Sequence, residues 1–521
     1  MKKTCLVTGP EIETWPDDCN LKLLGDFCIN DSNSSAIQDR EFTVVHPYGD
    51  NADTRKNDKD YVEHLYEKIL VSLSNFLNIN HNVNYPVRYW RILIGPWLNA
   101  IIPVLYNRWK KIDTALSSSC DEIIGVRYSL NSITPYDVSD FAYIHLRPEW
   151  NSDLISRILE FRKINFQIFD YTSIKIKHIQ PNKLSFIWRV RRYLGDIIRY
   201  ITFKDNNYFF LAPYIPRKEL IKLQLLLGQF PVFYRSKESP HINPDISYRE
   251  TIVFDFFQSN NFERFIADYL RYAIPTIYLE GFSNLSKITN SMLWPKEPRL
   301  IFTANSFYFD EIFKKWTADK ILINTPYFIG QHGGGYGIKE FAQRTELHEQ
   351  KTSDFWLSWG GVKYLQTTVI NSTNLKLIGK KITGNNYNKP FLLQITDDLF
   401  PYSRFPWCSD SFNKIYMDEQ VRFALSLDND IQKNLVVRLH YNQSRLGVDQ
   451  KKYWKEKAPY ICIDDGFSSI NKLIAKSRVV VSTYNATSFL ETLALDIPTI
   501  MFWSIDKSPV DDEAKPYFDI L

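Results

Sequence analysis

The chain has 521 residues, of which 44% are hydrophobic and 15% aromatic, so it is too long for one simple core and too apolar to be disordered. Its 63 basic and 59 acidic side chains nearly balance, which gives no argument for a nucleic-acid partner. The six cysteines form neither a CxxC pair nor a zinc-spaced cluster with histidine, so we expect no metal, no cofactor and a reducing, cytoplasmic setting. The first residues, MKKTCLVTG, lack the apolar core of a signal peptide.

Short buried strands and long helices are predicted in the first part of the chain. Apolar runs that end at turn residues predict strands at 5–9, 21–27 and 42–48. Apolar residues recur with helical spacing over 61–77. The most apolar stretch, 89–106, also carries an arginine, an asparagine and two prolines, so we expect a buried helix rather than a membrane span.

Strands and helices alternate in two later stretches. The first has a strand at 299–306, a helix at 309–320 and an apolar strand that ends at Gly330. The second follows a polar loop at 380–390 and alternates Val- and Ile-rich strands with helices. Strands that are apolar on both faces are typical of a parallel sheet covered by helices.

These alternations predict an α/β fold of two Rossmann-like domains that face each other across a cleft, the arrangement called GT-B. One domain would cover 1–380 with a mixed helical insertion at about 150–250, and the other would cover 385–521. Ligands should bind at the carboxyl ends of the strands. Because the sequence stops soon after its last strand, we expect the second domain to be cut short at its end.

A hydroxyl-rich turn between a strand and a helix is the strongest candidate site. A buried strand ends at Ser482 and Thr483, and Asn485, Thr487 and Ser488 follow before a helix. Free N–H groups at a helix start suit a phosphate. The alternative is that one of these hydroxyls simply caps the helix.

Two basic side chains end another predicted strand of the second domain. Arg438 and His440 lie two positions apart, so they point to the same face of the strand. Both could hold a nucleotide phosphate, and a protonated His440 could help the leaving group depart. The alternative for His440 is a hydrogen bond to a neighbouring loop.

A glycine-rich loop, GQHGGGYG, ends the last strand of the first domain. It holds five of the chain's 19 glycines. Bare backbone at Gly333, Gly334 and Gly335 would let a donor or acceptor approach main-chain N–H groups beside Gln331 and His332. The alternative is a tight turn with an incidental histidine.

Two glutamates are candidates for the catalytic carboxylate. Glu280 precedes Gly281 at an apparent strand end, and Glu13 follows the first strand. A carboxylate in a cleft can act as a general base or as a nucleophile. The alternative for both is a surface turn. His332 is the candidate that is not a carboxylate.

A basic and aromatic segment at 175–204 could lie on a membrane. It carries an excess of lysine and arginine, with tryptophan and tyrosine interleaved. Such a face suits anionic lipid, and the alternative is a solvated helix face.

Four segments carry a resemblance to a known family. HNVNYPVRYWRILIGPWL (81–98), FDEIFKKWTADK (309–320), GQHGGGYG and VVVSTYNATSFLETLALDIPTI resemble the bacterial transferases of O-antigen and other surface-polysaccharide loci. The resemblance covers nearly the whole chain. It implies transfer onto a glycan, or onto a lipid-linked glycan at the inner membrane surface.

A looser resemblance connects the chain with bacterial GT-B sialyltransferases and Kdo transferases. These enzymes carry an acidic-Gly motif, a His motif and a Ser/Ser or Ser/Thr motif, and Glu280-Gly281, His440 and Ser482-Thr483 follow in the same order. The sequence departs from their pattern where Tyr441, not proline, follows the histidine. In those enzymes the last two motifs hold the phosphate of a CMP-sugar.

The resemblance therefore implies a metal-independent glycosyltransferase that moves a nonulosonic acid of the sialic, legionaminic, pseudaminic or Kdo type. Residues 1–380 would take the acceptor and residues 385–521 the CMP-sugar donor. A His-Gly pair after an apolar strand is also similar to polyol-phosphate transferases that use CDP-glycerol or CDP-ribitol. The other alternative is a non-catalytic subunit of a glycan-assembly complex.

Overall fold

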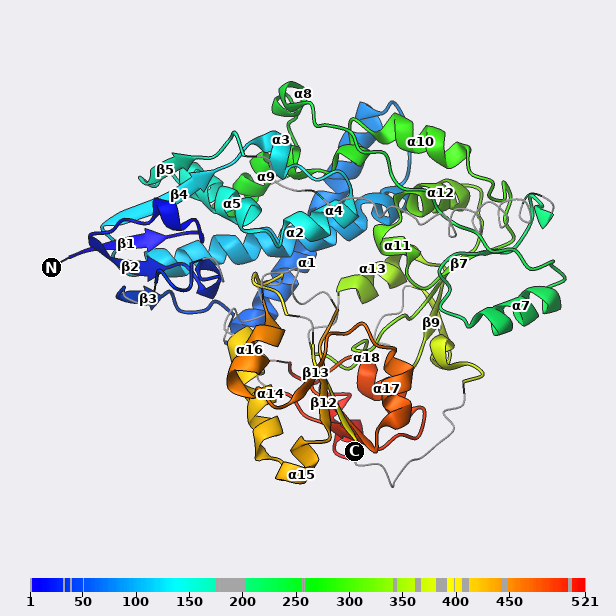
Figure 1. Ribbon diagram of the computed structural model, residues 1–521. Helices are drawn as coiled ribbons and strands as arrows, with labels where there is room; N and C mark the ends of the chain where they lie inside the picture. Colours follow the sequence, from blue (N-terminus) through cyan, green and yellow to red (C-terminus); the bar gives the residue numbers. More distant parts are fainter. Residues whose placement is uncertain are drawn as a thin grey trace.

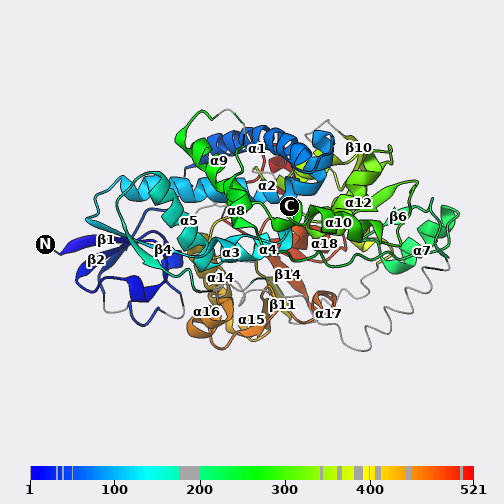
Figure 2. The same cartoon turned by 90° about the horizontal axis from the view of Figure 1, so that it is seen from above.

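The computed structural model describes residues 2–30, 33–37, 40–49, 51–174, 178, 200, 202–254, 256, 258–340, 344–360, 367–380, 391–397, 399–404, 412–441, 448–504 and 508–520. Within these residues the strands form three separate five-stranded parallel sheets. Figure 1 shows the first sheet at the left, the second at the right and the third below, and Figure 2 gives the same arrangement from above.

The first sheet has the strand order β3-β2-β1-β4-β5. Its strands are β1 (Lys3–Val7), β2 (Cys19–Leu23), β3 (Phe42–Val44), β4 (Glu122–Arg127) and β5 (Gln167–Asp170). The direction of winding reverses between β1 and β4, and such a switch point is where open α/β sheets bind ligands. The helical elements of this part of the chain are η1 (Ile12–Thr14), η2 (Asp26–Cys28), α3 (Leu130–Ile133), α4 (Val138–Ile144) and α5 (Pro148–Phe161).

The second sheet runs in plain chain order, β10-β9-β8-β7-β6. Its strands are β6 (Phe209–Phe210), β7 (Ile301–Thr303), β8 (Tyr327–Gly330), β9 (Phe355–Ser358) and β10 (Thr368–Asn371). The helical elements between and beside these strands are α7 (Arg217–Leu226), α8 (Ile246–Glu250), α9 (Asn261–Ala273), η3 (Thr276–Tyr278), α10 (Phe282–Asn290), α11 (Ser306–Phe309), α12 (Glu311–Ile321), α13 (Arg344–Thr352) and η4 (Leu375–Leu377).

The third sheet repeats the winding of the first, with the order β13-β12-β11-β14-β15. Its strands are β11 (Leu392–Ile395), β12 (Leu435–Arg438), β13 (Cys462–Asp464), β14 (Val479–Ser482) and β15 (Thr499–Met501), so its switch point lies between β11 and β14. The helices of this part are α14 (Phe412–Ser426), α15 (Asn429–Gln432), α16 (Gln450–Lys457), α17 (Ile470–Lys476), α18 (Thr487–Leu493) and α19 (Lys515–Phe518).

Two long helices join the first two sheets into one core. Helix α1 (Ala52–Asn80) begins where the Asn51 side chain accepts a hydrogen bond from the Thr54 amide, the usual way to satisfy a helix start. Helix α2 (Val87–Leu116) is buried along most of its length and packs against α1, α5, α9, α12 and α13. One large apolar cluster therefore runs through both sheets, while the third sheet has apolar clusters of its own.

The loop after β8 attaches the second sheet to the third. The Gly334 N–H donates to Thr487 Oγ1 at 2.8 Å. A Cβ at Gly334 would lie 2.4 Å from the carbonyl carbon of Ala486, so only glycine allows this approach. Further along the loop, the Glu340 N–H donates to the Pro509 carbonyl oxygen (3.1 Å) and the Asp511 N–H to that of Ile338 (2.8 Å).

The α/β class with parallel sheets is confirmed, as are the helices predicted at 61–77 and 89–106, which lie within α1 and α2. The described residues between 1 and 380 hold two sheets, one more than a single Rossmann-like domain would need. The GT-B arrangement of two facing domains and the domain boundaries stay predictions, and most of the proposed linker at 380–390 lies outside the described residues. No helix in the described part of the chain is long and apolar enough to cross a membrane.

The strand predicted to end at Glu280 is wrong. The apolar run before Glu280 forms the 3-10 helix η3, and α10 follows at once. Thr276, Ile277 and Tyr278 are buried as a core strand would be. A short buried apolar run has the same appearance in a strand and in a helical turn, so its spacing could not distinguish them.

Replacing Gly334 by alanine should destabilise the contact between the second and third sheets. The new Cβ would meet the backbone at Ala486, which cannot move aside as a flexible side chain can, so we expect a loss of about 1–3 kcal/mol in the free energy of unfolding. Urea unfolding measures this loss. The matched control is Gly333→Ala, whose Cβ would meet only Thr487 Oγ1 at 3.3 Å. Equal midpoints for the two variants would contradict the proposed contact.

Candidate functional site

The loop after β8 places His332 against a buried carboxylate. The Nδ1 atom of His332 lies 3.1 Å from the Tyr336 hydroxyl and 3.5 Å from Glu349 Oε1. The Tyr336 hydroxyl donates its single proton to Glu349 Oε1 at 2.6 Å. The His332 Nδ1 must therefore carry its own proton and donate it to Tyr336, which leaves the lone pair on Nε2.

Burial keeps the His332 imidazole neutral near pH 7. Loss of solvent lowers the pKa of His332 to about 4, and the positive charge of Lys376 acts in the same direction. The side chain still exposes 23% of its surface, so it is not sealed in the core. A neutral, partly exposed imidazole with a free Nε2 can accept a proton from a bound hydroxyl group.

Glu349 is a candidate that the sequence analysis missed. It lies on α13, has no exposed surface, and accepts hydrogen bonds from Tyr336 and from Trp356 Nε1, the latter at 3.0 Å. A buried carboxylate behind a histidine orients the ring and stabilises the imidazolium that forms when the ring takes a proton. The sequence gives no sign of this pairing, because His332 and Glu349 meet only when α13 packs beside β8 and β9.

Strained backbone and a lysine surround His332. Ala212 and Tyr214, just after β6, both have positive φ angles, 45° and 54°. The Tyr214 ring lies near His332, and its hydroxyl accepts a hydrogen bond from Asn305 Nδ2 at 2.9 Å. Such strain costs about 1–3 kcal/mol per residue and gathers at functional sites.

Lys376 joins this group from η4. Its Nζ lies 5.1 Å from the centre of the Tyr214 ring and 3.6 Å from Glu491 Oε1 on α18. Burial lowers the pKa of Lys376, and the negative charge of Glu491 opposes that shift. The contact with Glu491 places a cationic group of the second sheet beside the third sheet.

The hydroxyl-rich turn after β14 is mostly engaged in holding its own fold. The Ser482 and Ser488 hydroxyl groups form a hydrogen bond with each other. The Thr483 hydroxyl donates to the Ile395 carbonyl oxygen at 2.9 Å and lies 2.6 Å from the Tyr416 hydroxyl. Thr487 accepts from Gly334, as described above. The prediction that these hydroxyls bind phosphate is therefore left with few open groups to support it.

Asn485 is the exception in that turn. Its side chain is only 1% exposed, and neither its amide nitrogen nor its amide oxygen has a hydrogen-bond partner within the described part of the chain. A buried unpaired amide costs about 1–3 kcal/mol per group. It follows β14, beside the switch point of the third sheet, so a ligand with both a donor and an acceptor could satisfy it.

The bare glycine backbone has a different neighbour from the one expected. We predicted that a donor or acceptor would approach Gly333, Gly334 and Gly335. At Gly334 the close neighbour is the protein's own chain at Ala486 and Thr487, while Gly335 has a positive φ of 90°. Gln331 is also engaged, because its Nε2 donates to the Gly333 carbonyl oxygen at 2.9 Å and its Oε1 accepts from the Trp359 N–H at 2.8 Å.

Arg438 and His440 stand at the carboxyl end of β12, as predicted. The Arg438 guanidinium is committed to Asp464 at 2.8 Å and to the carbonyl oxygens of Ser468 and Gly466. It therefore shapes the loop after β13 in this structure. The His440 ring lies against Tyr441, with 4.7 Å between the ring centres. Strands β12 and β14 both run parallel to β11, which lies between them. His440 and Asn485, which follow these two strands, therefore lie at the same carboxyl end of the sheet.

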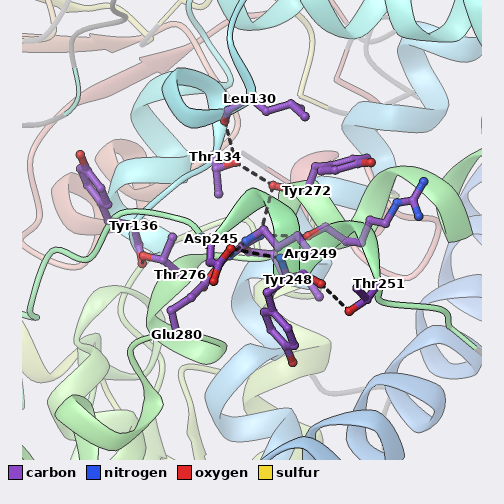
Figure 3. A network of polar contacts seen from close by, with 12 residues as sticks. Leu130, Thr134, Tyr136, Asp245, Tyr248, Arg249, Thr251, Tyr272, Thr276 and Glu280 are labelled. Atoms are coloured by element: carbon purple, nitrogen blue, oxygen red, sulfur yellow. Dashed lines mark hydrogen bonds and ion pairs between the residues drawn. The ribbon is translucent and has the colours of Figure 1, made fainter.

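Glu280 does not stand at the end of a strand. It lies between η3 and α10 and forms an ion pair with Arg249. Its carboxylate accepts from Arg249 Nε at 2.7 Å and from Arg249 Nη2 at 2.8 Å, and Figure 3 shows this pair between α8 and α10. Arg249 has no exposed surface and also donates to the carbonyl oxygens of Arg271, Tyr272 and Ile274. The Asp245 N–H donates to the same carboxylate at 3.0 Å. This geometry gives Glu280 a structural part in joining these helices.

The loop after β1 holds a half-buried carboxyl group, but it belongs to Glu11. The predicted residue, Glu13, is exposed and accepts from the Tyr171 hydroxyl at 2.8 Å. Glu11 instead folds back over the end of β1, where the hydroxyls of Ser152 and Tyr128 donate to it at 3.1 and 3.2 Å. Burial raises the pKa of the Glu11 carboxyl. The sequence placed an acid in this loop, but only the turn decides which of the two glutamates is the less exposed.

The remaining predictions concern metals and membranes. The described residues contain no group of three or more His, Cys, Asp or Glu side chains that could hold a metal ion. Most of the basic segment 175–204 lies outside the described residues, so its contact with lipid stays a prediction.

The first and third sheets each have a switch point, the place where open α/β sheets bind ligands. Residues 4–521 match the model of the LIC12162 family transferase, and the chain belongs to that family. The prediction of a transferase is thereby confirmed at this coarse level. A search of curated proteins finds no significant match.

Replacing Glu280 by alanine should destabilise the protein strongly. Arg249 would stay buried without its carboxylate, and removing one partner of a buried ion pair costs about 3–5 kcal/mol. Urea unfolding measures the change. The matched control is Asp268→Ala, which breaks the exposed pair with Arg271, where we expect less than about 1 kcal/mol. Similar small losses in both variants would show that the Arg249–Glu280 pair does not hold these helices together.

Glu11→Gln should flatten the dependence of stability on pH. Because the folded state raises the pKa of Glu11 above its ordinary value of 4.5, the folded state binds this proton more tightly than the unfolded chain does. The stability that the Glu11 proton adds is fully present below pH 4.5 and is lost as the pH rises through the pKa of the folded state. Over this pH range the free energy of unfolding of the wild type therefore falls relative to that of Glu11→Gln. Unfolding midpoints across this pH range measure the difference. The control Glu13→Gln should follow the wild-type curve, and a Glu11→Gln curve parallel to the wild type would refute the assignment.

Proposed function

We propose that this chain is a glycosyltransferase that moves a nonulosonic acid from a CMP-sugar onto a surface-glycan acceptor. The observation that carries the proposal is the contact of the Gly334 backbone with Thr487. It brings the His332–Glu349 pair of the second sheet next to the turn that holds Asn485 on the third. A base and an unsatisfied ligand-binding group at one junction suit the transfer of a group between two substrates.

The third sheet is the proposed donor side. Asn485 follows β14 at the switch point, where nucleotides bind in folds of this winding. Its amide offers one acceptor oxygen and two donor hydrogens, a pattern complementary to the edge of a cytosine base. This complementarity supports a cytidine nucleotide, whose phosphate would lie towards His440 at the same carboxyl end of the sheet. Arg438 and the hydroxyls from Ser482 to Ser488 would act mainly by shaping the site.

His332 is the proposed general base. Its free Nε2 would take the proton of the acceptor hydroxyl group while the acceptor oxygen bonds to the anomeric carbon. The bond between that carbon and the phosphate oxygen breaks, and CMP leaves with the electron pair. Glu349, through Tyr336, would stabilise the imidazolium that results. Lys376 supplies a positive charge near the departing phosphate.

We place His332 ahead of both carboxylates predicted from the sequence. Glu280 is held by Arg249, and a general base whose lone pairs are committed to a guanidinium is a poor proton acceptor. Glu13 stands exposed in η1, where the Tyr171 hydroxyl donates to it. Both remain hypotheses that the activity of their glutamine variants would test.

A polyol-phosphate transferase that uses CDP-glycerol or CDP-ribitol is the second candidate. The observation that favours it is the His332-Gly333 pair at the end of a buried strand, with a neutral imidazole and a nearby lysine. In that reaction the acceptor oxygen would attack phosphorus rather than carbon. The same cytidine-binding group would serve both donors, so the product distinguishes them. In either case we propose a cytoplasmic enzyme whose segment 175–204 contacts the inner membrane surface.

The donor prediction is tested by nucleotide binding. CMP or CDP at 100 times its dissociation constant should stabilise the protein by about 2.7 kcal/mol, measured by thermal unfolding. Asn485→Ala should lose this effect while keeping the stability of the free protein, because alanine leaves no unpaired amide buried. Asn434→Ala, which removes a hydrogen bond to the Asp430 carbonyl oxygen at the start of β12, is the matched control. Stabilisation by UDP or GDP but not by cytidine nucleotides would overturn the donor assignment.

The same experiment separates binding from chemistry. His332→Gln should bind the nucleotide normally but lose about 10²–10⁴ in transfer rate, the usual contribution of a general base. A non-catalytic subunit would show no transfer in the wild type. Transfer by His332→Gln at the wild-type rate would remove His332 from the mechanism and leave the donor assignment standing.

A further inference from the structure

A pocket lies away from the junction, between α1, α2 and α9. Its volume is about 490 Å³, within the range that small-molecule sites occupy in proteins. The lining side chains are aromatic or polar: Tyr61, Tyr106, Trp109, Lys110, Asp113, Arg162, Asn260, Asn261 and Phe262. None of the residues that form the His332 or Asn485 site is among them.

Aromatic rings form one wall of this pocket. The Phe262 ring contacts Tyr106 and Trp109, with centre-to-centre distances of 5.0 and 5.6 Å, and Tyr61 lies 5.3 Å from Tyr106. Each ring packs against its neighbours, which fixes the wall without a ligand. Tyr106, Trp109 and Phe262 are buried, so the wall presents only a small apolar surface to the pocket.

Polar groups stand around the aromatic wall. Arg162 lies 3.7 Å over the Trp109 ring and donates to Asp113 Oδ1 at 2.7 Å, while its buried Nε has no partner within the described residues. Lys110 lies near the Tyr106 ring. Asn260 Nδ2 donates to the Tyr61 hydroxyl at 3.0 Å. Asp113 is 47% exposed, so its second oxygen is open to a ligand.

We propose that this pocket binds a saccharide unit, whose hydroxyl groups meet the polar side chains that surround the aromatic wall. Planar donors and acceptors such as Arg162, Asp113 and Asn261 suit the alternating donors and acceptors of sugar hydroxyls. An organic cation fits poorly, because Lys110 and Arg162 already occupy the faces of the rings and would repel it. The pocket is thus a second ligand site of the chain.

The place of this pocket on α2 suggests what it does. The pocket uses Tyr106, Trp109 and Asp113, whereas Arg108 of the same helix points to the Ser403 carbonyl oxygen beside the third sheet, at 2.7 Å. The two sets of side chains leave α2 on different faces. If the proposed glycosyltransferase function holds, the pocket would bind a sugar of the acceptor glycan at a distance from the transfer site.

Saturation-transfer NMR with methyl β-glucopyranoside and methyl β-glucuronide tests the proposal on the full chain. Both probes should show ring-proton transfer, and Asp113→Ala should raise their dissociation constants about tenfold, as the loss of one charge-assisted hydrogen bond does. Asp60→Ala, an exposed change on α1 outside the lining, is the matched control. Trp109→Ala should abolish the transfer. If Trp109→Ala fails to fold, Asp113→Ala still tests the proposal.

Three outcomes overturn the proposal: no transfer to either sugar, transfer that Asp113→Ala leaves unchanged, or binding of choline in preference to both sugars. Transfer to the glucuronide alone also overturns it, because charge and not the ring would then be recognised. CMP-dependent stabilisation is measured on the same samples. If CMP stabilises the protein but neither sugar binds, only the proposal for the pocket is wrong. If the sugars bind but CMP does not stabilise the protein, only the donor site is wrong.

Discussion

The close approach of the Gly334 backbone to Ala486 and Thr487 is the constraint on which the candidate site depends. No side chain fits between these two segments, because even a Cβ at Gly334 would lie within 2.5 Å of the Ala486 carbonyl oxygen. The glycine loop is therefore a joint between two sheets that otherwise have separate apolar clusters. The turn after β14 is consequently held close to the loop that carries His332.

Electrostatics at this junction is arranged by burial more than by charge pairing. His332 is kept neutral by desolvation and by Lys376, while Glu349 stays fully enclosed behind it. Within the described part of the chain, neither the nitrogen nor the oxygen of the buried Asn485 amide has a hydrogen-bond partner, a cost in the free protein that a ligand could remove. Unpaired polar groups and strained residues such as Tyr214 lower stability where they stand, and they are tolerated where a protein prepares a site.

The acidic residues show the opposite use of charge. Glu280 is matched to Arg249 at two hydrogen bonds, and that pair joins the helices around η3. Glu11 is half-buried and accepts hydrogen bonds from two hydroxyl groups, and desolvation is the largest cause of its raised pKa, so its proton is held more tightly.

The sequence by itself determined the α/β class, the long buried helices and the loops at strand ends that carry His332, His440 and Asn485. Those features follow from local spacing, because a buried strand and the polar residues after it are neighbours in the chain. Only the tertiary structure decided that residues 1–380 hold two sheets, that Glu280 meets Arg249, and that Glu349 stands behind His332. These are contacts between segments far apart in sequence, and an apolar run or a lone carboxylate carries no information about which distant segment will pack against it.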